Sequence, residues 1–173
     1  MALQGVNRWL GLLLGAAAIV LIGCPPGDGT FEQPMEELTV PTTVRELYEF
    51  LEARSYRDFD HESAPHPPAG PHQVTVQAYM NRALVQSLTD GNTQHPRGSV
   101  AIKELYDTEG ALFGWAVMVK QREGDDGTAW FWYETHRGPG RAENPNYVGD
   151  GVGACIECHA EGRGYVRIPF PLR

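Results

Sequence analysis

The chain has 173 residues, of which 42% are hydrophobic, and a formal net charge of −8 at pH 7. This length supports one well-filled core and is too short for two ordinary domains. With only two lysines, Lys103 and Lys120, and no basic run, the chain lacks the clustered cations that contact phosphates, so no nucleic-acid partner is expected.

The first 23 residues have the layout of an export signal. Arg8 precedes an apolar stretch over 9–22, which is shorter than the roughly 20 residues that span a bilayer. The stretch ends with Leu-Ile-Gly before Cys24, which resembles the lipobox of bacterial lipoproteins. The resemblance implies a lipoprotein signal peptide over 1–23 and lipidation of Cys24, which would anchor the chain at the periplasmic face of a bacterial membrane. An ordinary signal peptide with a chance cysteine, or an uncleaved anchor, is the alternative.

Residues 24–41 predict a flexible tether, because they mix Pro, Gly and acidic residues without periodicity. The folded domain is expected over 42–173. Its first element should be a helix, since Thr43 and Glu46 have capping-box spacing and apolar residues recur at helical intervals behind them. A Pro-rich loop over 60–72 follows, and its three histidines are expected to be solvated.

The middle of the chain predicts an antiparallel sheet. Alternating, β-branched and aromatic residues predict strands over 74–80, 99–106, 112–121 and 128–135, with a short helix over 81–88. Residues 123–127 form a good hairpin turn. The aromatic run 130–133 predicts a sheet with apolar contacts on both faces, which either a sandwich core or a flat apolar cofactor would explain.

The strongest motif lies near the C-terminus, where two residues separate Cys155 from Cys158 and His159 follows directly. This is the c-type haem attachment pattern, in which the thiols bond to the two vinyl groups of one porphyrin and the imidazole ligates the iron. The motif predicts one covalently bound haem c on Cys155, Cys158 and His159, with His159 as the metal ligand.

Three alternative roles of the cysteine pair compete with haem attachment. A zinc site usually has four ligands and often a second cysteine pair, which this sequence lacks. A thioredoxin-like pair begins a helix in a βαβ unit, whereas the flanks here have the composition of Gly-rich loops. A structural disulfide would leave His159 without a role.

The sixth iron position has several candidates in the sequence. They are Met35, Met80, Met118 and the five other histidines, His61, His66, His72, His95 and His136. Met80 and Met118 lie within apolar strand patterns and are expected in the core. No methionine follows the motif, although small all-helical electron-transfer cytochromes supply one there.

The strands and the late motif together resemble the cytochrome P460 and cytochrome c′-β family. The resemblance covers the chain from Tyr56 onward, and its segments are 98–106, 114–120, 130–133, the haem motif and 165–171. It implies a mainly β (α+β) fold: an antiparallel sheet with an N-terminal helix, and a short haem-attachment helix or loop near the C-terminus. It also implies a His-ligated iron with an open distal position.

The resemblance offers two activities. Cytochromes P460 oxidise hydroxylamine, and they have a lysine–haem cross-link and a proton-relaying distal glutamate. The c′-β members lack the cross-link and bind small gases at an apolar distal face. Lys103 matches the cross-linking lysine, although an ordinary rim lysine explains it equally. The acidic position falls on Ala116, which cannot relay a proton. Glu104 or Glu134 could replace the missing acid only if its side chain faced the iron. Strand alternation places the Glu104 and Lys103 side chains on opposite faces of one strand.

The expected function is therefore that of a periplasmic haem c protein which binds small gas or nitrogen-oxide ligands, or passes electrons to a periplasmic redox partner. A P460-type hydroxylamine oxidoreductase is the first alternative, and a simple electron-transfer cytochrome is the second. A homodimer is compatible with either.

Overall fold

A computed structural model describes residues 38–72 and 75–173 of the chain. These residues belong to one compact unit. The expected export signal, Cys24, Met35 and most of the expected tether lie outside the described residues. Within the described residues, no helix is both long enough and apolar enough to cross a membrane.

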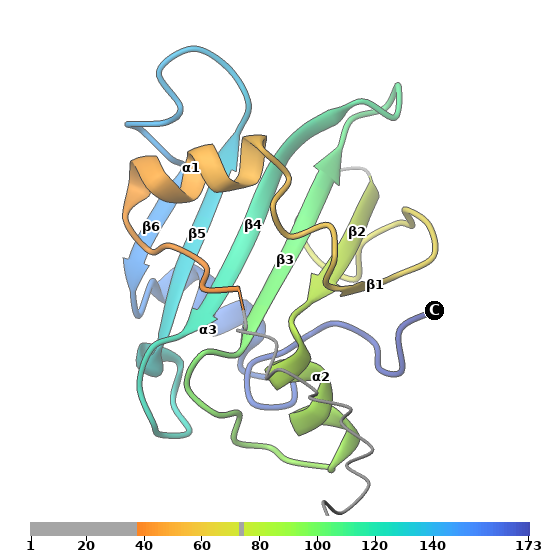
Figure 1. Cartoon of the computed structure of the whole chain (residues 1–173), viewed down its shortest axis with the longest axis vertical. Helices are drawn as coiled ribbons and strands as arrows, with labels where there is room; N and C mark the ends of the chain where they lie inside the picture. The colour runs from red at the N-terminus through yellow and green to blue at the C-terminus, as the bar shows by residue number, and fades with distance from the viewer. Residues whose placement is uncertain (1–37, 73–74) are drawn as a thin grey trace, which may run out of the picture. The chain divides into compact units, whose positions relative to one another are not determined.

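The fold is one six-stranded antiparallel sheet with three helices, which confirms the expected mainly β class. Neighbouring strands are also consecutive along the chain, so the sheet is a simple meander (Figure 1). The strands are β1 (Asp60–His61), β2 (Thr75–Met80), β3 (Val100–Tyr106), β4 (Leu112–Lys120), β5 (Trp130–His136) and β6 (Tyr147–Asp150). The helices are α1 (Val44–Glu52), α2 (Arg82–Thr89) and α3 (Gly153–His159), and a 3₁₀ turn, η1 (Gly127–Ala129), precedes β5.

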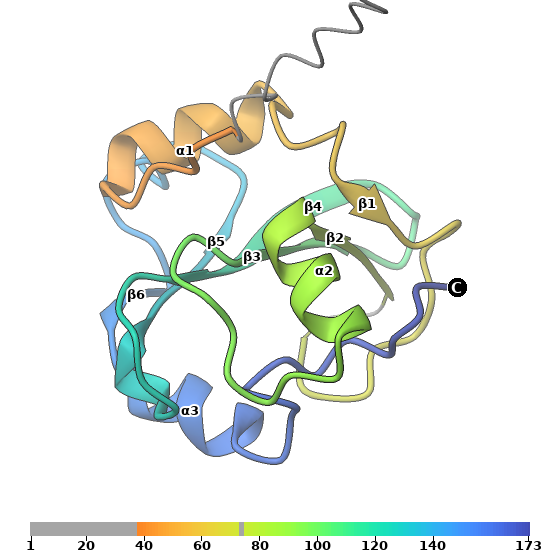
Figure 2. The ribbon, with the colours of Figure 1, turned by 60° about the horizontal axis from the view of Figure 1, so that its bottom comes forward.

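Two apolar clusters form, one on each face of the sheet. Helix α1 covers the first face with Leu47 and Leu51, which are both fully buried. Helices α2 and α3 and the C-terminal segment cover the second face, so that α1 and α3 lie on opposite sides of the sheet (Figure 2). Strand β5 contributes to both clusters, because its side chains alternate between the faces. The prediction of apolar contacts on both faces of this strand is confirmed.

Several local expectations need correction. The Thr43 hydroxyl donates to the Glu46 carboxylate and makes no capping bond to the backbone of α1, so the capping box is incomplete. The sequence does not predict strands β1 and β6: β1 is only two residues long, and β6 contains glycine, which weakens any strand pattern. In α2, by contrast, Asn81 caps the helix by accepting from the Leu84 N–H.

Candidate functional site

Helix α3 carries the cysteine pair and the adjacent histidine. It begins at Gly153, so the motif lies on a short helix, which is one of the two forms expected near the C-terminus, a short helix or a loop. Cys155 and Cys158 are both free thiols, and helical spacing of three and four residues places Cys158 and His159 beside Cys155 on one side of the helix. The sheet is antiparallel, so the helix does not belong to a βαβ unit.

His159 is held in one orientation. Its Nδ1 lies 2.7 Å from the carbonyl oxygen of Tyr165, which can only accept, so Nδ1 carries the proton and donates. Burial is the main cause that lowers the pKa of His159 to about 4, and the nearby Lys103 and Arg167 cations lower it further. The imidazole is therefore neutral at pH 7, with Nε2 unprotonated, which is the form that ligates metals.

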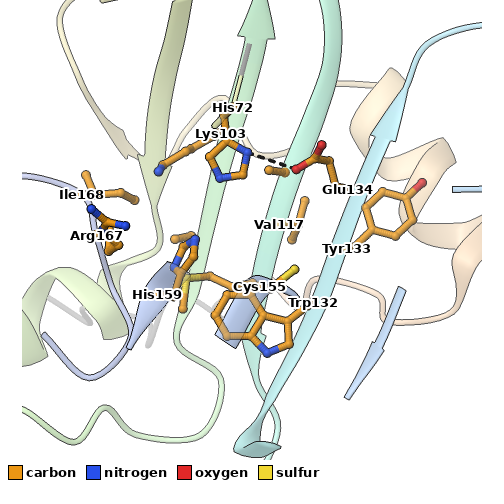
Figure 3. Close-up of a pocket in the computed structure, with 13 residues that line it drawn as sticks. His72, Lys103, Val117, Trp132, Tyr133, Glu134, Cys155, His159, Arg167 and Ile168 are labelled. Atoms are coloured by element: carbon orange, nitrogen blue, oxygen red, sulfur yellow. Dashed lines mark hydrogen bonds and ion pairs between the residues drawn. The ribbon is translucent and has the colours of Figure 1, made fainter. Parts of the chain in front are cut away.

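An apolar slot separates α3 from the sheet (Figure 3). The space between the side chains is about 400 Å³, part of which is open to solvent. The edge of the Trp132 ring packs on His159, with the ring centres 4.8 Å apart. The remaining lining residues are His72, Ala101, Lys103, Ala116, Val117, Met118, Tyr133, Glu134, Cys155, Arg167 and Ile168.

A row of register partners crosses the sheet at the slot. Lys103 on β3 lies opposite Ala116 on β4, and Ala116 lies opposite Glu134 on β5. Ala116 lines the slot, and the lining is not purely apolar, because Glu134 and Lys103 flank Ala116. Glu134 was recognisable in the sequence: it follows Trp130 and Trp132 at intervals of two, so it shares their face.

Lys103 and Glu104 point to opposite faces, as alternation predicted. Lys103 lines the slot, and burial is the main cause that lowers its pKa. Among the described residues, its amine makes no hydrogen bond or ion pair. Arg167, the second cation of the slot, donates to the Cys158 carbonyl oxygen at 2.6 Å. The Glu104 side chain lies on the opposite face of the sheet, which α1 covers, and its carboxylate is fully buried against Tyr56.

His72 is the residue that sequence reasoning misplaced. The expectation that the loop histidines are solvated holds for His61 and for His66, whose side chain is 40% exposed, but the side chain of His72 is only 17% exposed. Its Nδ1 lies 3.0 Å from the Glu134 carboxylate, and its ring centre lies 6.2 Å from that of His159. The side chain enters the slot from the loop before β2 (Figure 3). No pattern in the Pro-rich loop distinguishes it.

The other candidate ligands are more ordinary. Met80 is a fully buried core residue, and Met118 is buried while also lining the slot. His95 is buried between Ser87 and Arg163, and His136 stacks on Phe113 at the far end of β5. Within the described ranges, no three His, Cys, Asp or Glu side chains gather to hold a metal ion by themselves.

The residues present fit a haem group. They supply two unpaired thiols, one oriented neutral imidazole and an apolar slot for a flat ring, with two cations suited to the ring's carboxylates. No protein-family model and no curated protein matches the chain.

Proposed function

We propose that this chain is an exported single-haem cytochrome c that binds small nitrogen-oxide ligands or passes electrons. One observation carries the proposal: two free thiols and a neutral, oriented imidazole share a short helix above an apolar slot. Cys155 and Cys158 would attach the haem, and His159 would ligate its iron. When bound, the haem supplies a one-electron redox centre and an axial position for a ligand.

The attachment chemistry needs only groups that the motif supplies. Each thiol S–H would add across one vinyl double bond of the porphyrin, so that a sulfur–carbon bond would form and the hydrogen would go to the other vinyl carbon. Lys103 and Arg167 would neutralise the carboxylates of the ring, since both are close to the slot and neither has a buried carboxylate partner among the described residues.

The test is covalent attachment in a host that exports and matures cytochromes c. Unmodified protein should retain haem on a denaturing gel and show the mass of chain plus one haem. The double variant Cys155→Ala, Cys158→Ala should lose both signals. Cys24→Ser is the matched control, because it removes a thiol outside the motif and should keep the haem. Unmodified protein without bound haem, or a double variant that keeps it, would refute the proposal.

The same control tests the expected lipid anchor at Cys24. If that cysteine is acylated, Cys24→Ser should release the protein from the membrane fraction or leave its signal uncleaved. An unchanged, membrane-bound mature mass would exclude acylation at this position.

Oxidation of hydroxylamine is a second candidate, and the placement of Glu134 favours it. Ala116 cannot relay a proton, but Glu134 supplies a carboxylate from the next strand of the same row. Steady-state oxidation with an artificial electron acceptor should then depend on Glu134, and Glu134→Gln should reduce turnover about 10²–10⁴-fold as expected for a lost general base. Turnover that is absent, or unaffected by this variant, would remove the candidate.

A further inference from the structure

We infer that His72 is the second axial ligand of the haem iron, so that the resting iron is held by His72 and His159 together. The inference rests on the proposed haem and deepens it, because it names what occupies the distal position. It starts from two histidines that are 87 positions apart in the sequence and yet line one slot. Their ring planes lie 72° apart.

Both imidazoles present the same free atom. The Nδ1 of His159 donates to the Tyr165 carbonyl, and the Nδ1 of His72 donates to the Glu134 carboxylate at 3.0 Å. Among the described residues, the Nε2 atom of neither ring makes a hydrogen bond to the protein. An Nδ1–H that donates to a carbonyl or carboxylate while Nε2 binds metal is the usual second-shell arrangement of metal-ligating histidines.

The spacing of the rings matches a shared metal. A metal–imidazole bond is about 2.0 Å, so two rings on opposite sides of one ion have centres roughly 6.4 Å apart. The observed separation of the His72 and His159 ring centres is 6.2 Å. The two histidines are therefore already at the distance that one iron between them requires.

Glu134 acquires a role as a positioning residue. The Glu134 side chain is 18% exposed, and its carboxylate accepts a hydrogen bond from His72, which lies on an irregular loop and not on the sheet. Without this bond the His72 ring would be free to rotate, so Glu134 fixes both the tautomer and the direction of Nε2.

A ligated His72 has a consequence for the function. A small gas must displace it before binding, so the resting protein is suited to passing electrons, and its apparent affinity for ligands is reduced by the fraction of time the position is free. The displaceable residue lies on the loop between β1 and β2 and not on a strand of the sheet.

The test compares ferric spectra and electron paramagnetic resonance of His72→Ala with those of His66→Ala. His66 lies in the same loop but outside the slot, so it is the matched control. Unmodified protein and His66→Ala should be low-spin, whereas His72→Ala should be high-spin and return to low-spin with added imidazole. His72→Ala should also bind carbon monoxide about 10- to 100-fold more tightly.

Three outcomes separate the inference from the proposed function. Haem-loaded protein that is high-spin without modification overturns the inference alone. So does a low-spin spectrum that survives His72→Ala, since Lys103 or Met118 would then be the ligand. Protein that takes up no haem overturns the proposed function itself, and the absence of haem absorption identifies this case. Glu134→Gln should keep the iron low-spin but raise its reduction potential, because a neutral amide makes the imidazole less electron-rich than a carboxylate does. An unchanged potential contradicts the positioning role.

Discussion

Two neighbouring charged residues of β3, Lys103 and Glu104, point to opposite faces of the sheet and differ in their hydrogen-bond partners. Behind the sheet, the buried Glu104 carboxylate accepts from Tyr56 at 2.6 Å, Tyr79 at 3.1 Å, Arg57 at 2.9 Å and also from Tyr106. On the other face, Lys103 points into the slot, and its amine has no partner among the described residues. Protein groups thus satisfy the Glu104 carboxylate, whereas the Lys103 amine lacks a partner that a bound group could supply.

The presence or absence of hydrogen-bond partners distinguishes a buried charge with a structural role from one with a functional role. A buried charge whose hydrogen-bonding capacity is satisfied stabilises the surrounding packing, and burial together with Glu104 raises the pKa of Tyr79 to about 12. A half-buried charge without a partner is costly to keep, and such groups cluster at binding and catalytic sites. The apolar slot and the cysteine pair lie on the same face of the sheet as the Lys103 side chain.

The largest expected effect is on the free energy of unfolding, and it arises on the face that α1 covers. Glu104→Ala should lower the free energy of unfolding by about 3–5 kcal/mol, because three tyrosine hydroxyls and the Arg57 guanidinium lose a buried acceptor. Lys103→Ala, one residue away on the same strand, should change it by less than about 1 kcal/mol. Urea unfolding followed by circular dichroism measures both. Equal losses in the two variants would break the contrast between the faces.

A smaller effect is expected where α3 is held above the slot. An added Cβ at Gly127 would come within 2.6 Å of the Ile156 side chain of that helix. Gly127→Ala should therefore push α3 outward and destabilise the fold by about 1–3 kcal/mol, as overpacking does. Gly153→Ala is the control, since its Cβ would meet no atom within 4 Å.

The readout for this pair is haem uptake together with thermal unfolding. Gly127→Ala should show less of both than Gly153→Ala, which should resemble unmodified protein. If Gly127→Ala unfolds normally and loads haem fully, Ile156 is not what seats the helix.

The smallest effect concerns acid stability of the slot face. His95 is buried: the Ser87 hydroxyl donates to its Nδ1, while its Nε2 donates to the Arg163 carbonyl just after α3, each at 2.9 Å. Burial is the main cause that lowers the pKa of His95, and the Arg163 and Lys120 cations lower it further. The unfolded chain thus binds a proton near pH 6.5 that the folded chain does not.

This difference in proton binding means that the folded state loses stability as the pH falls. The stability that His95 contributes is fully present above about pH 6.5 and is lost as pH falls toward the lower folded pKa, by at most about 1.4 kcal/mol per pH unit. His95→Gln should make the dependence of the unfolding free energy on pH shallower between about pH 6.5 and 5 than in the unmodified protein. An unchanged slope would show that His95 does not anchor the segment after α3 by this means.

The sequence alone determined what depends on short spacing. The two-residue gap between Cys155 and Cys158 with His159 behind them, the opposite faces of Lys103 and Glu104, and the central strands all follow from periods of two or of three to four residues. These patterns are local, so they can be read without knowing how the chain folds back on itself.

Only the tertiary structure decided which distant groups meet. His72 and Glu134 are 62 residues apart, and their contact depends on the register of β4 against β5 and on the path of a Pro-rich loop that has no period. The two-residue strand β1 and the glycine-containing β6 also form only because their neighbours offer unpaired backbone groups. Residue type suggested an attachment helix, but packing against the sheet placed a second histidine, a carboxylate and a lysine in front of it, because burial and register, unlike spacing, are properties of the whole fold.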